Sequence, residues 1–293
     1  MKVTEIIQSE TLTLSFEVFP PKNDAAFDGV MGAAAAIARL RPSFISVTYG
    51  AGGGGSRYTV EIARRLQQGE DTTTLAHLTC VSANREDIRK YLATLQAEGI
   101  ANIMALRGDL PEGMTPDAMR ASAYPHASDL IREIRASGDF CIGAACYPEV
   151  HPESTNQAED LCRLKEKIEA GADFLTTQMF FDNNVLYNFL YKLREAGITV
   201  PMVPGIMPIT SASQVERAQK LSGSFMPRRF TSLVDHFGTS PEAMKQAGII
   251  YAAGQIIDLY ANGIRHVHIY TMNKLDVAMA IRDCLFAMLG RTF

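Results

Sequence analysis

One carboxylate stands inside an apolar stretch near the start of the chain. Glu17 lies between Phe16 and Val18 in LTLSFEVFPPK, residues 12–22. An acid in such a setting either pairs with a basic side chain or stays desolvated, and desolvation raises the pKa of a carboxyl group. A carboxyl group of that second kind can hold a proton near neutral pH and act as a general acid. The stretch alone leaves both interpretations open.

Other reactive side chains stand at or just beyond the carboxyl ends of further apolar runs. They are Thr48 and Tyr49, His77 and Thr79, Arg107 with Gly108 and Asp109, Tyr147 with Glu149 and His151, Gln178, and Tyr270 with Asn273 and Lys274. In a parallel barrel the carboxyl ends of the strands meet at one mouth, where the chemistry of such folds takes place. Polar groups on nearly every run therefore favour an active site and favour a functional role for Glu17.

The apolar, β-branched runs alternate with segments of helical periodicity, as β-α units do. The expected strands are residues 13–19, 44–50, 74–80, 102–108, 141–147, 174–180, 200–207 and 266–272. Helical patterns at 85–99, 158–172 and 183–197 are closed by Gly99, Gly171 and Gly197, which is typical of a helix end before a strand. Strands that are apolar on both faces require a parallel sheet covered by helices.

About eight such units predict an α/β fold, a (β/α)8 TIM barrel. A doubly wound sheet would want a G-x-G-x-x-G turn after the first strand, and FPPKND does not match it. Residues 208–263 are too long for one helix and predict an extra helical segment before the last strand. Without a linker or an internal repeat, residues 1–293 are expected to form a single barrel catalytic domain.

Composition limits the classes of partner. Hydrophobic residues make up 47% and charged residues 20% of the 293 positions, which predicts a substantial core and no disorder. A net charge of −4 without a basic run argues against nucleic acid. Five scattered cysteines fit reduced thiols in a cytoplasmic protein. The longest small-residue run, 30–38, is too short to cross a membrane, and the N-terminus has no signal-peptide pattern.

Metal and phosphate motifs are weak. Cys80, Cys146 and His151 lack the spacing of a zinc site, and packing is the preferred interpretation of His266 and His268, so no metal is expected. The run GAGGGGSRYT, residues 50–59, is compatible with a phosphate cradle and equally with a flexible loop. In LRGDLP, residues 106–111, the glycine would let a flat ligand approach the backbone.

Several longer motifs occur in order along nearly the whole chain: SFEVFPPK, SVTYGA, AHLTC, ALRGDLP, ASDLI, CYPEVHPE, TTQMFFD and PGIMPI. Together they resemble the methylenetetrahydrofolate reductase family in its bacterial single-domain form. The resemblance implies a barrel with FAD at its mouth. It also implies interconversion of 5,10-methylenetetrahydrofolate and 5-methyltetrahydrofolate, with NAD(P)H as electron donor and ping-pong kinetics through FAD. Family members commonly form homo-oligomers, dimers or tetramers.

The resemblance also implies roles for individual residues. Glu17 falls on the catalytic acid, which would protonate N10 of the folate, and Asp109 falls beside the flavin and the pterin. Gln178, Gln214, Tyr270 and Lys274 fall on substrate-binding positions. FAD-contacting positions are occupied by Thr48, His77, Leu106, Arg107, Gly108, Asp109, His126, Ala127, Tyr147, His151, Asp160, Arg163 and Lys167.

Some positions depart from the family pattern. His126 stands where a tyrosine is usual, and Arg163 and Glu166 stand where the enterobacterial form has Asn and Arg along the FAD phosphates. Lys274 replaces an arginine, and Ala218 replaces a phenylalanine that helps to stack the ligands. FAD binding is still expected, because most of its contacts are retained. The departures bear on donor preference and on affinity for the folate tail.

NADH is the expected donor rather than NADPH, because no second basic cluster is present for a 2′-phosphate. Alternatives from other classes remain. Another FAD-dependent barrel, of the proline-dehydrogenase type, would not need Glu17 together with Gln178. A zinc-dependent methyltransferase would need clustered cysteines. A non-catalytic flavin- or folate-binding protein would not need an acid on the first strand.

Overall fold

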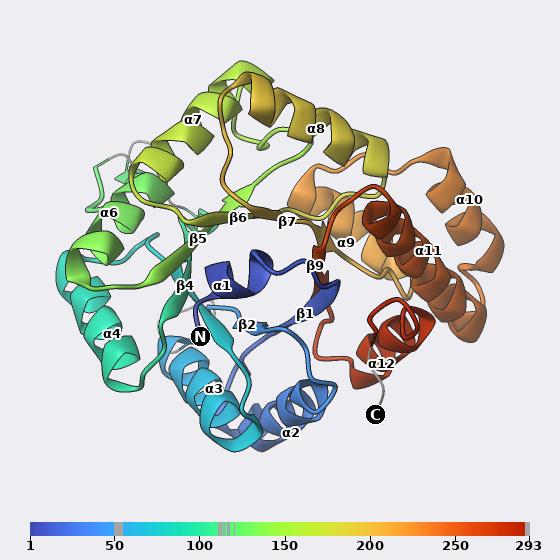
Figure 1. The fold of residues 1–293 in the computed structure, drawn as a ribbon, viewed down its shortest axis with the longest axis horizontal. Coiled ribbons are helices and arrows are strands. Elements are labelled where there is room, and N and C mark those ends of the chain that lie inside the picture. Colours follow the sequence, from blue (N-terminus) through green and yellow to red (C-terminus); the bar gives the residue numbers. More distant parts are fainter. Residues whose placement is uncertain (50–54, 111–112, 114, 116–117, 120, 291–293) are drawn as a thin grey trace.

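Parallel strands form one curled sheet with helices around its outside (Figure 1). The structure is a computed structural model that describes residues 1–49, 55–110, 113, 115, 118–119 and 121–290. The strands are β1 (Thr13–Val18), β2 (Ile45–Val47), β3 (Thr74–Thr79), β4 (Asn102–Leu106), β5 (Cys141–Cys146), β6 (Phe174–Thr177), β7 (Met202–Val203), β8 (Gly205–Ile206) and β9 (His266–Tyr270). Each lies within one of the predicted apolar runs, so all of those runs are confirmed as strands.

The barrel is nearly closed through a strand that is split in two. The sheet order is β7-β6-β5-β4-β3-β2-β1-β9-β8, so its two ends are neighbours in the sequence. Pro204 separates them, because proline has no N–H to give to a ladder. On one side Leu175 pairs with Met202, and on the other Gly205 pairs with His268. The run at 200–207 thus acts as one split strand, the seventh of eight along the chain, and the predicted TIM-barrel fold is confirmed.

The helices follow the strands in the predicted alternation. They are α1 (Val3–Ile7), α2 (Phe27–Ala38), α3 (Gly55–Glu70), α4 (Arg85–Ala97), α6 (Ala127–Ser137), α7 (Gln157–Glu169), α8 (Asn183–Glu195), α9 (Ala212–Ser222), α10 (Arg228–Phe237), α11 (Pro241–Ala261) and α12 (Leu275–Cys284), with a short 3-10 helix, η1 (Asp24–Ala26). The predicted helices at 85–99, 158–172 and 183–197 correspond to α4, α7 and α8. Their closing glycines have φ of 69°, 115° and 73° (Gly99, Gly171, Gly197), the left-handed conformation that glycine adopts most easily. The extra segment before the last strand contains α9, α10 and α11.

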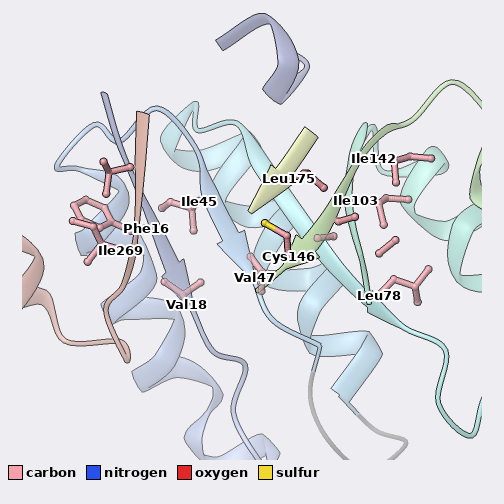
Figure 2. Close-up of a cluster of buried hydrophobic side chains, with 14 of the residues drawn as sticks. Phe16, Val18, Ile45, Val47, Leu78, Ile103, Ile142, Cys146, Leu175 and Ile269 are labelled. Carbon is pink, nitrogen blue, oxygen red and sulfur yellow. The ribbon is translucent and has the colours of Figure 1, made fainter. Parts of the chain in front are cut away.

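The strands are buried on both faces, which explains their continuous apolar sequences. Outward-facing side chains such as Phe16, Ile45 and Leu175 form one layer of the core, shown in Figure 2, and pack against the helices. Inward-facing side chains such as Leu75 and Phe174 fill the interior near the amino ends of the strands.

The short helix α1 lies across the ring of strands at that end (Figure 1) and adds Val3 and Ile7 to the inner layer. The Val3 N–H donates to Asn102 Oδ1 over 2.8 Å, which ties α1 to β4. One end of the barrel is therefore filled with apolar side chains, and the polar strand ends face the other. No helix in the described part of the chain is long and apolar enough to cross a lipid bilayer.

Candidate active site

A cavity of about 2230 Å³ opens at the carboxyl ends of the strands. Sites for drug-sized ligands commonly measure about 300–1,000 Å³, so this cavity has room for more than one ligand. Its walls include nearly all of the predicted site residues: Glu17, Thr48, His77, Leu106, Arg107, Gly108, Asp109, His126, Ala127, Tyr147, His151, Asp160, Arg163, Lys167, Gln178, Gln214 and Tyr270. Glu166 and Ala218 lie there as well, whereas Lys274 lies beside the wall.

Glu17 sits on the floor of this cavity and is only 6% exposed. Burial raises its pKa to about 8, although a hydrogen bond with Ser46 works in the opposite direction. Its basic neighbour is His77, whose Nε2 lies 3.7 Å from Glu17 Oε2. Burial lowers the pKa of His77 to about 4, so at neutral pH both groups are mainly uncharged. The contact is therefore between a protonated acid and a neutral imidazole, not an ion pair.

A chain of neutral polar groups continues below Glu17. His268 Nε2 lies 3.0 Å from Ser46 Oγ, and His268 Nδ1 lies 2.8 Å from Ser15 Oγ. Burial, with a smaller contribution from the nearby His77, lowers the pKa of His268 to about 3, so this ring is also neutral. Glu17 is thus held over a hydrogen-bonded network with no formal charge.

Ser46 and His268 were missed as site residues by the sequence reasoning. The signal that could have found them is the alternation of side chains between the two faces of a strand. In the β1–β9 register Glu17 pairs with Tyr270 and Ser15 with His268, so these side chains all point into the barrel. His266, which the same alternation turns inward nearer the amino end, hydrogen-bonds Thr13 Oγ1 over 2.7 Å. The packing interpretation of His266 is therefore confirmed, whereas His268 belongs to the cavity floor.

Tyr270 covers the gap where the barrel closes. Its hydroxyl donates to the Thr177 carbonyl over 2.6 Å, and the Gly205 N–H donates to Thr177 Oγ1 over 2.9 Å. A Cβ on Gly205 would overlap both the Tyr270 hydroxyl and the Thr177 carbonyl, so only glycine allows this approach. Burial, followed by the nearby Glu17, raises the pKa of Tyr270 far above its usual value.

The loop after β4 has a backbone that requires glycine. Gly108 has φ of +90°, and a Cβ there would lie 2.7 Å from Val81 Cγ1. Beside it, Arg107 forms a two-pronged ion pair with Glu153, each N···O distance being 2.5 Å. This pair joins the loop after β4 to the loop after β5 and neutralises the guanidinium. Asp109 stands exposed at the lip of the cavity.

The wall formed by α6 and α7 carries donors for a phosphate group. Lys167 is largely buried, and its Nζ donates to the Ala145 carbonyl over 2.8 Å, its one acceptor among the described residues, which leaves two N–H groups for a ligand. His126, Ala127 and Ser128 at the start of α6 also line the cavity, and the first turn of a helix offers free N–H groups to anions. Arg163 is paired with Glu166 at 3.1 Å, so its charge is partly neutralised.

The flat groups of the site fit a dinucleotide carrying a planar ring. The Tyr147 and His151 rings meet edge to face with centroids 4.5 Å apart, and the His151 backbone N–H donates to Asp160 over 3.3 Å. Together with the glycine approach at Gly108 and the Lys167 ammonium, this donor set is compatible with FAD.

The two predicted substrate glutamines come from different elements. Gln178 follows β6, and its Oε1 accepts from the Met179 N–H over 2.9 Å. Gln214 lies in the first turn of α9, and its Oε1 accepts from the Thr210 N–H (2.7 Å) and Oγ1 (3.1 Å). Lys274 donates to Thr210 Oγ1 over 2.9 Å.

The glycine-rich run and the possible metal ligands add nothing to this site. Residues 50–54 of the glycine-rich run lie outside the described residues. Within the described ranges, no three His, Cys, Asp or Glu side chains gather closely enough to hold a metal ion. The five cysteines are free thiols, with Cys80, Cys141 and Cys146 buried.

Comparison with known proteins places this site in a family. The family model described as methylenetetrahydrofolate reductase matches residues 2–285. The 5,10-methylenetetrahydrofolate reductase of Pectobacterium carotovorum subsp. carotovorum is 35% identical over 271 residues, covering 92% of this chain and 89% of that protein. The enzyme of that name from Escherichia coli K12 is 33% identical, with the same coverage.

Longer relatives match as well. A rice protein named probable methylenetetrahydrofolate reductase (NADH) is 36% identical over 96% of this chain, which spans about half (50%) of that protein's length. Among solved structures, an uncharacterized Clostridium thermocellum protein described as binding two copies of 5-methyl-5,6,7,8-tetrahydrofolic acid has a TM-score of 0.68. It covers 99% of this chain and 100% of its own at 13% identity, a likeness of fold alone. On the family match and the bacterial relatives, the chain belongs to the methylenetetrahydrofolate reductase family of enzymes.

Proposed function

We propose that the chain reduces 5,10-methylenetetrahydrofolate to 5-methyltetrahydrofolate, using NADH and an FAD bound in the barrel mouth. The single observation that carries this proposal is the buried carboxyl group of Glu17, whose pKa of about 8 keeps it protonated at neutral pH. Family membership supplies the substrate class. A flavin- or folate-binding protein without catalysis would have no use for such an acid.

Glu17 acts as the proton donor. The closed five-membered ring of the substrate is a poor hydride acceptor, and protonation of N10 opens it to a reactive iminium. Transfer of the Glu17 proton leaves a carboxylate in a buried site, and the Ser46 hydroxyl can donate a hydrogen bond to it. A general acid works best when its pKa lies near the working pH, which the desolvation of Glu17 provides.

The α6–α7 wall binds the cofactor. Lys167 and the N–H groups at the start of α6 hold the phosphates, and Gly108 admits the flat ring to the backbone after β4. Asp109, at the lip, would contact the flavin and the pterin, as its position in the family pattern implies. When bound, FAD supplies the hydride-carrying chemistry that the side chains lack.

NADH is the proposed donor rather than NADPH. The rice relative and one from Arabidopsis thaliana carry NADH in their names. Besides Lys167 and Arg163 on α7, the described cavity wall carries Arg57, Lys90 and Arg217. Each of these three stands alone on a different helix (α3, α4 and α9), whereas a 2′-phosphate site would gather cations together.

The first test is the visible spectrum of the purified protein. We expect a yellow protein with about one FAD per chain, which NADH bleaches under anaerobic conditions and methylenetetrahydrofolate restores. A colourless protein that takes up no FAD on reconstitution would contradict the proposal. Faster bleaching by NADPH would correct the donor while leaving the reaction class intact.

A further inference from the structure

A line of hydrogen bonds runs from the loop after β9 to the first turn of α9. Lys274 Nζ donates to Thr210 Oγ1 (2.9 Å), and Thr210 Oγ1 donates to Gln214 Oε1 (3.1 Å). Thr210 is 8% exposed, so its hydroxyl is shielded from water. Gln214 lines the cavity and Lys274 does not, so the line leads from outside the cavity to its wall.

The chemistry of the end groups fixes the direction of every bond in this line. A lysine ammonium can only donate, so Thr210 Oγ1 must accept from Lys274 and give its own hydrogen onward. The Thr210 backbone N–H can also only donate, and it lies 2.7 Å from the same atom of Gln214. That atom must therefore be the amide oxygen, whichever way an amide side chain might otherwise be assigned.

Two donors to one oxygen use both of its lone pairs, so the oxygen of Gln214 has no capacity left for a ligand. The amide nitrogen keeps two N–H groups, and no described residue accepts a hydrogen bond from it. We propose that Lys274 is a positioning residue which, through Thr210, holds the Gln214 amide with its N–H groups toward the cavity to bind an acceptor group of the folate. This inference rests on the proposed function for the identity of the ligand.

The position of Lys274 in the fold supports this role over a local structural one. It is the N-cap residue of α12, where it provides no side-chain cap. A positive charge at the start of a helix is also unfavourable, because the helix macrodipole is positive there. The Lys274 side chain therefore does nothing favourable for its own helix, and its hydrogen-bond partner lies on the segment before α9.

The Gln214 contacts by themselves would also stabilise the start of α9, so the decisive variants must separate capping from ligand binding. Gln214→Glu keeps an oxygen for the Thr210 N–H and hydroxyl but has no N–H to give. An acid is favourable in the first turn of a helix, so this variant should fold. We expect the Kd for 5-methyltetrahydrofolate, measured by calorimetry on the FAD-loaded protein, to rise about 10-fold or more.

A double-mutant cycle tests whether Lys274 acts through Thr210. Lys274→Met should raise the same Kd by about 3- to 10-fold in the wild-type background and change it little in a Thr210→Val background. Thr210→Ser, which keeps the hydroxyl, should restore the Lys274 effect. FAD content and thermal unfolding of each variant control for loss of fold.

The outcomes separate this proposal from the reaction on which it rests. If the wild type binds folate and Gln214→Glu binds equally well, the amide orientation is wrong. If Lys274→Met has the same effect in the wild-type and the Thr210→Val backgrounds, Lys274 contacts the ligand itself and the positioning role is overturned. If the loaded wild type binds no 5-methyltetrahydrofolate, the proposed function fails and this inference fails with it.

Discussion

The floor and the α6–α7 wall of the same cavity are built on opposite electrostatic principles. On the floor, Glu17, His77 and His268 are buried, and desolvation drives each toward its neutral form. On the wall, Arg163 pairs with Glu166 near water, and the Lys167 ammonium donates to the Ala145 carbonyl, although burial lowers its pKa. Beside the wall, the Arg107–Glu153 ion pair joins the loops after β4 and β5. The floor keeps the Glu17 carboxyl group protonated, so that it can donate a proton, and the wall attracts an anion such as a phosphate group. A variant should therefore affect proton transfer or cofactor affinity according to the region in which it lies.

The largest effect is expected from Glu17→Gln. The amide keeps the size of the side chain, but its N–H protons are not acidic enough to be transferred. Reduction of the bound FAD by NADH needs no acid and should persist, whereas reoxidation by methylenetetrahydrofolate should slow by about 10²–10⁴-fold or more. Stopped-flow absorbance measures the two half-reactions separately.

Asp109→Asn, which changes the acid at the lip of the cavity, is measured beside Glu17→Gln in the same two half-reactions. If both half-reactions of Glu17→Gln fall together while FAD stays bound, Glu17 is a binding or structural residue. If neither falls, the acid lies elsewhere, and Asp109 is the next candidate.

A smaller effect is expected on the wall. Lys167→Gln removes the ammonium but keeps a donor for the Ala145 carbonyl, and we expect the Kd of FAD to rise by about 10- to 100-fold. Lys165→Gln on the same helix is the matched control, since Lys165 is exposed and is not part of the cavity wall. Fluorescence titration of the apoprotein with FAD gives both constants. Equal effects of the two variants would mean that only overall charge matters.

Glu17 also predicts a pH-dependent contribution to stability with a definite sign. The pKa of Glu17 is raised to about 8 from an ordinary value of 4.5, so between these pH values the unfolded chain releases a proton that the folded protein keeps. The contribution of Glu17 to the free energy of unfolding should therefore fall as pH rises through this window, whereas the lowered pKa values of His77 and His268 make their contributions rise as pH approaches 6.5.

One pKa unit corresponds to about 1.4 kcal/mol, so the total is expected to be roughly a few kcal/mol. Glu17→Gln should remove only the Glu17 contribution, so the wild type's free energy of unfolding minus that of the variant should fall between pH 5 and pH 8, which urea unfolding of the two apoproteins would measure. Parallel pH profiles for the variant and the wild type would show that Glu17 titrates normally.

The contrast between the two regions also marks what the sequence could predict. The strands were predictable because both faces of a parallel strand are buried, so Phe16 and Ile45 face the helices while Leu75 faces the interior. Helix ends were predictable where a glycine such as Gly171 takes a positive φ. These are local properties, and local patterns reveal them.

The polar network of the floor was not predictable in the same way. Ser46 and His268 meet because β2 and β9 both flank β1, and that register is set over more than 200 residues (222 between the two). The position of the Lys274 side chain could not be predicted from the sequence either. Met272 and Asn273 precede it with φ of 55° and 58°, and no pattern marks a methionine for this left-handed conformation.

The smallest effect is expected at Glu166, where the sequence departs from the enterobacterial family pattern. Its carboxylate pairs with Arg163 on the surface of α7, and both residues line the cavity. Glu166→Arg would remove the partner of Arg163 and add a second cation, so the affinity for the FAD phosphates should rise. Because these groups are near water, we expect only about a 2- to 5-fold decrease in the Kd of FAD.

Glu169→Arg is the matched control for this variant, because it makes the same change of charge one turn further along α7 and away from the cavity wall. Screening by salt should reduce the gain of Glu166→Arg at high ionic strength. An equal gain in FAD affinity for both variants would show that the added positive charge acts at long range and makes no local contact with the phosphates. A loss of affinity in Glu166→Arg would mean instead that the Arg163–Glu166 pair orders α7 for the cofactor, and the wall would then depend on paired charges as strictly as the floor depends on neutral ones.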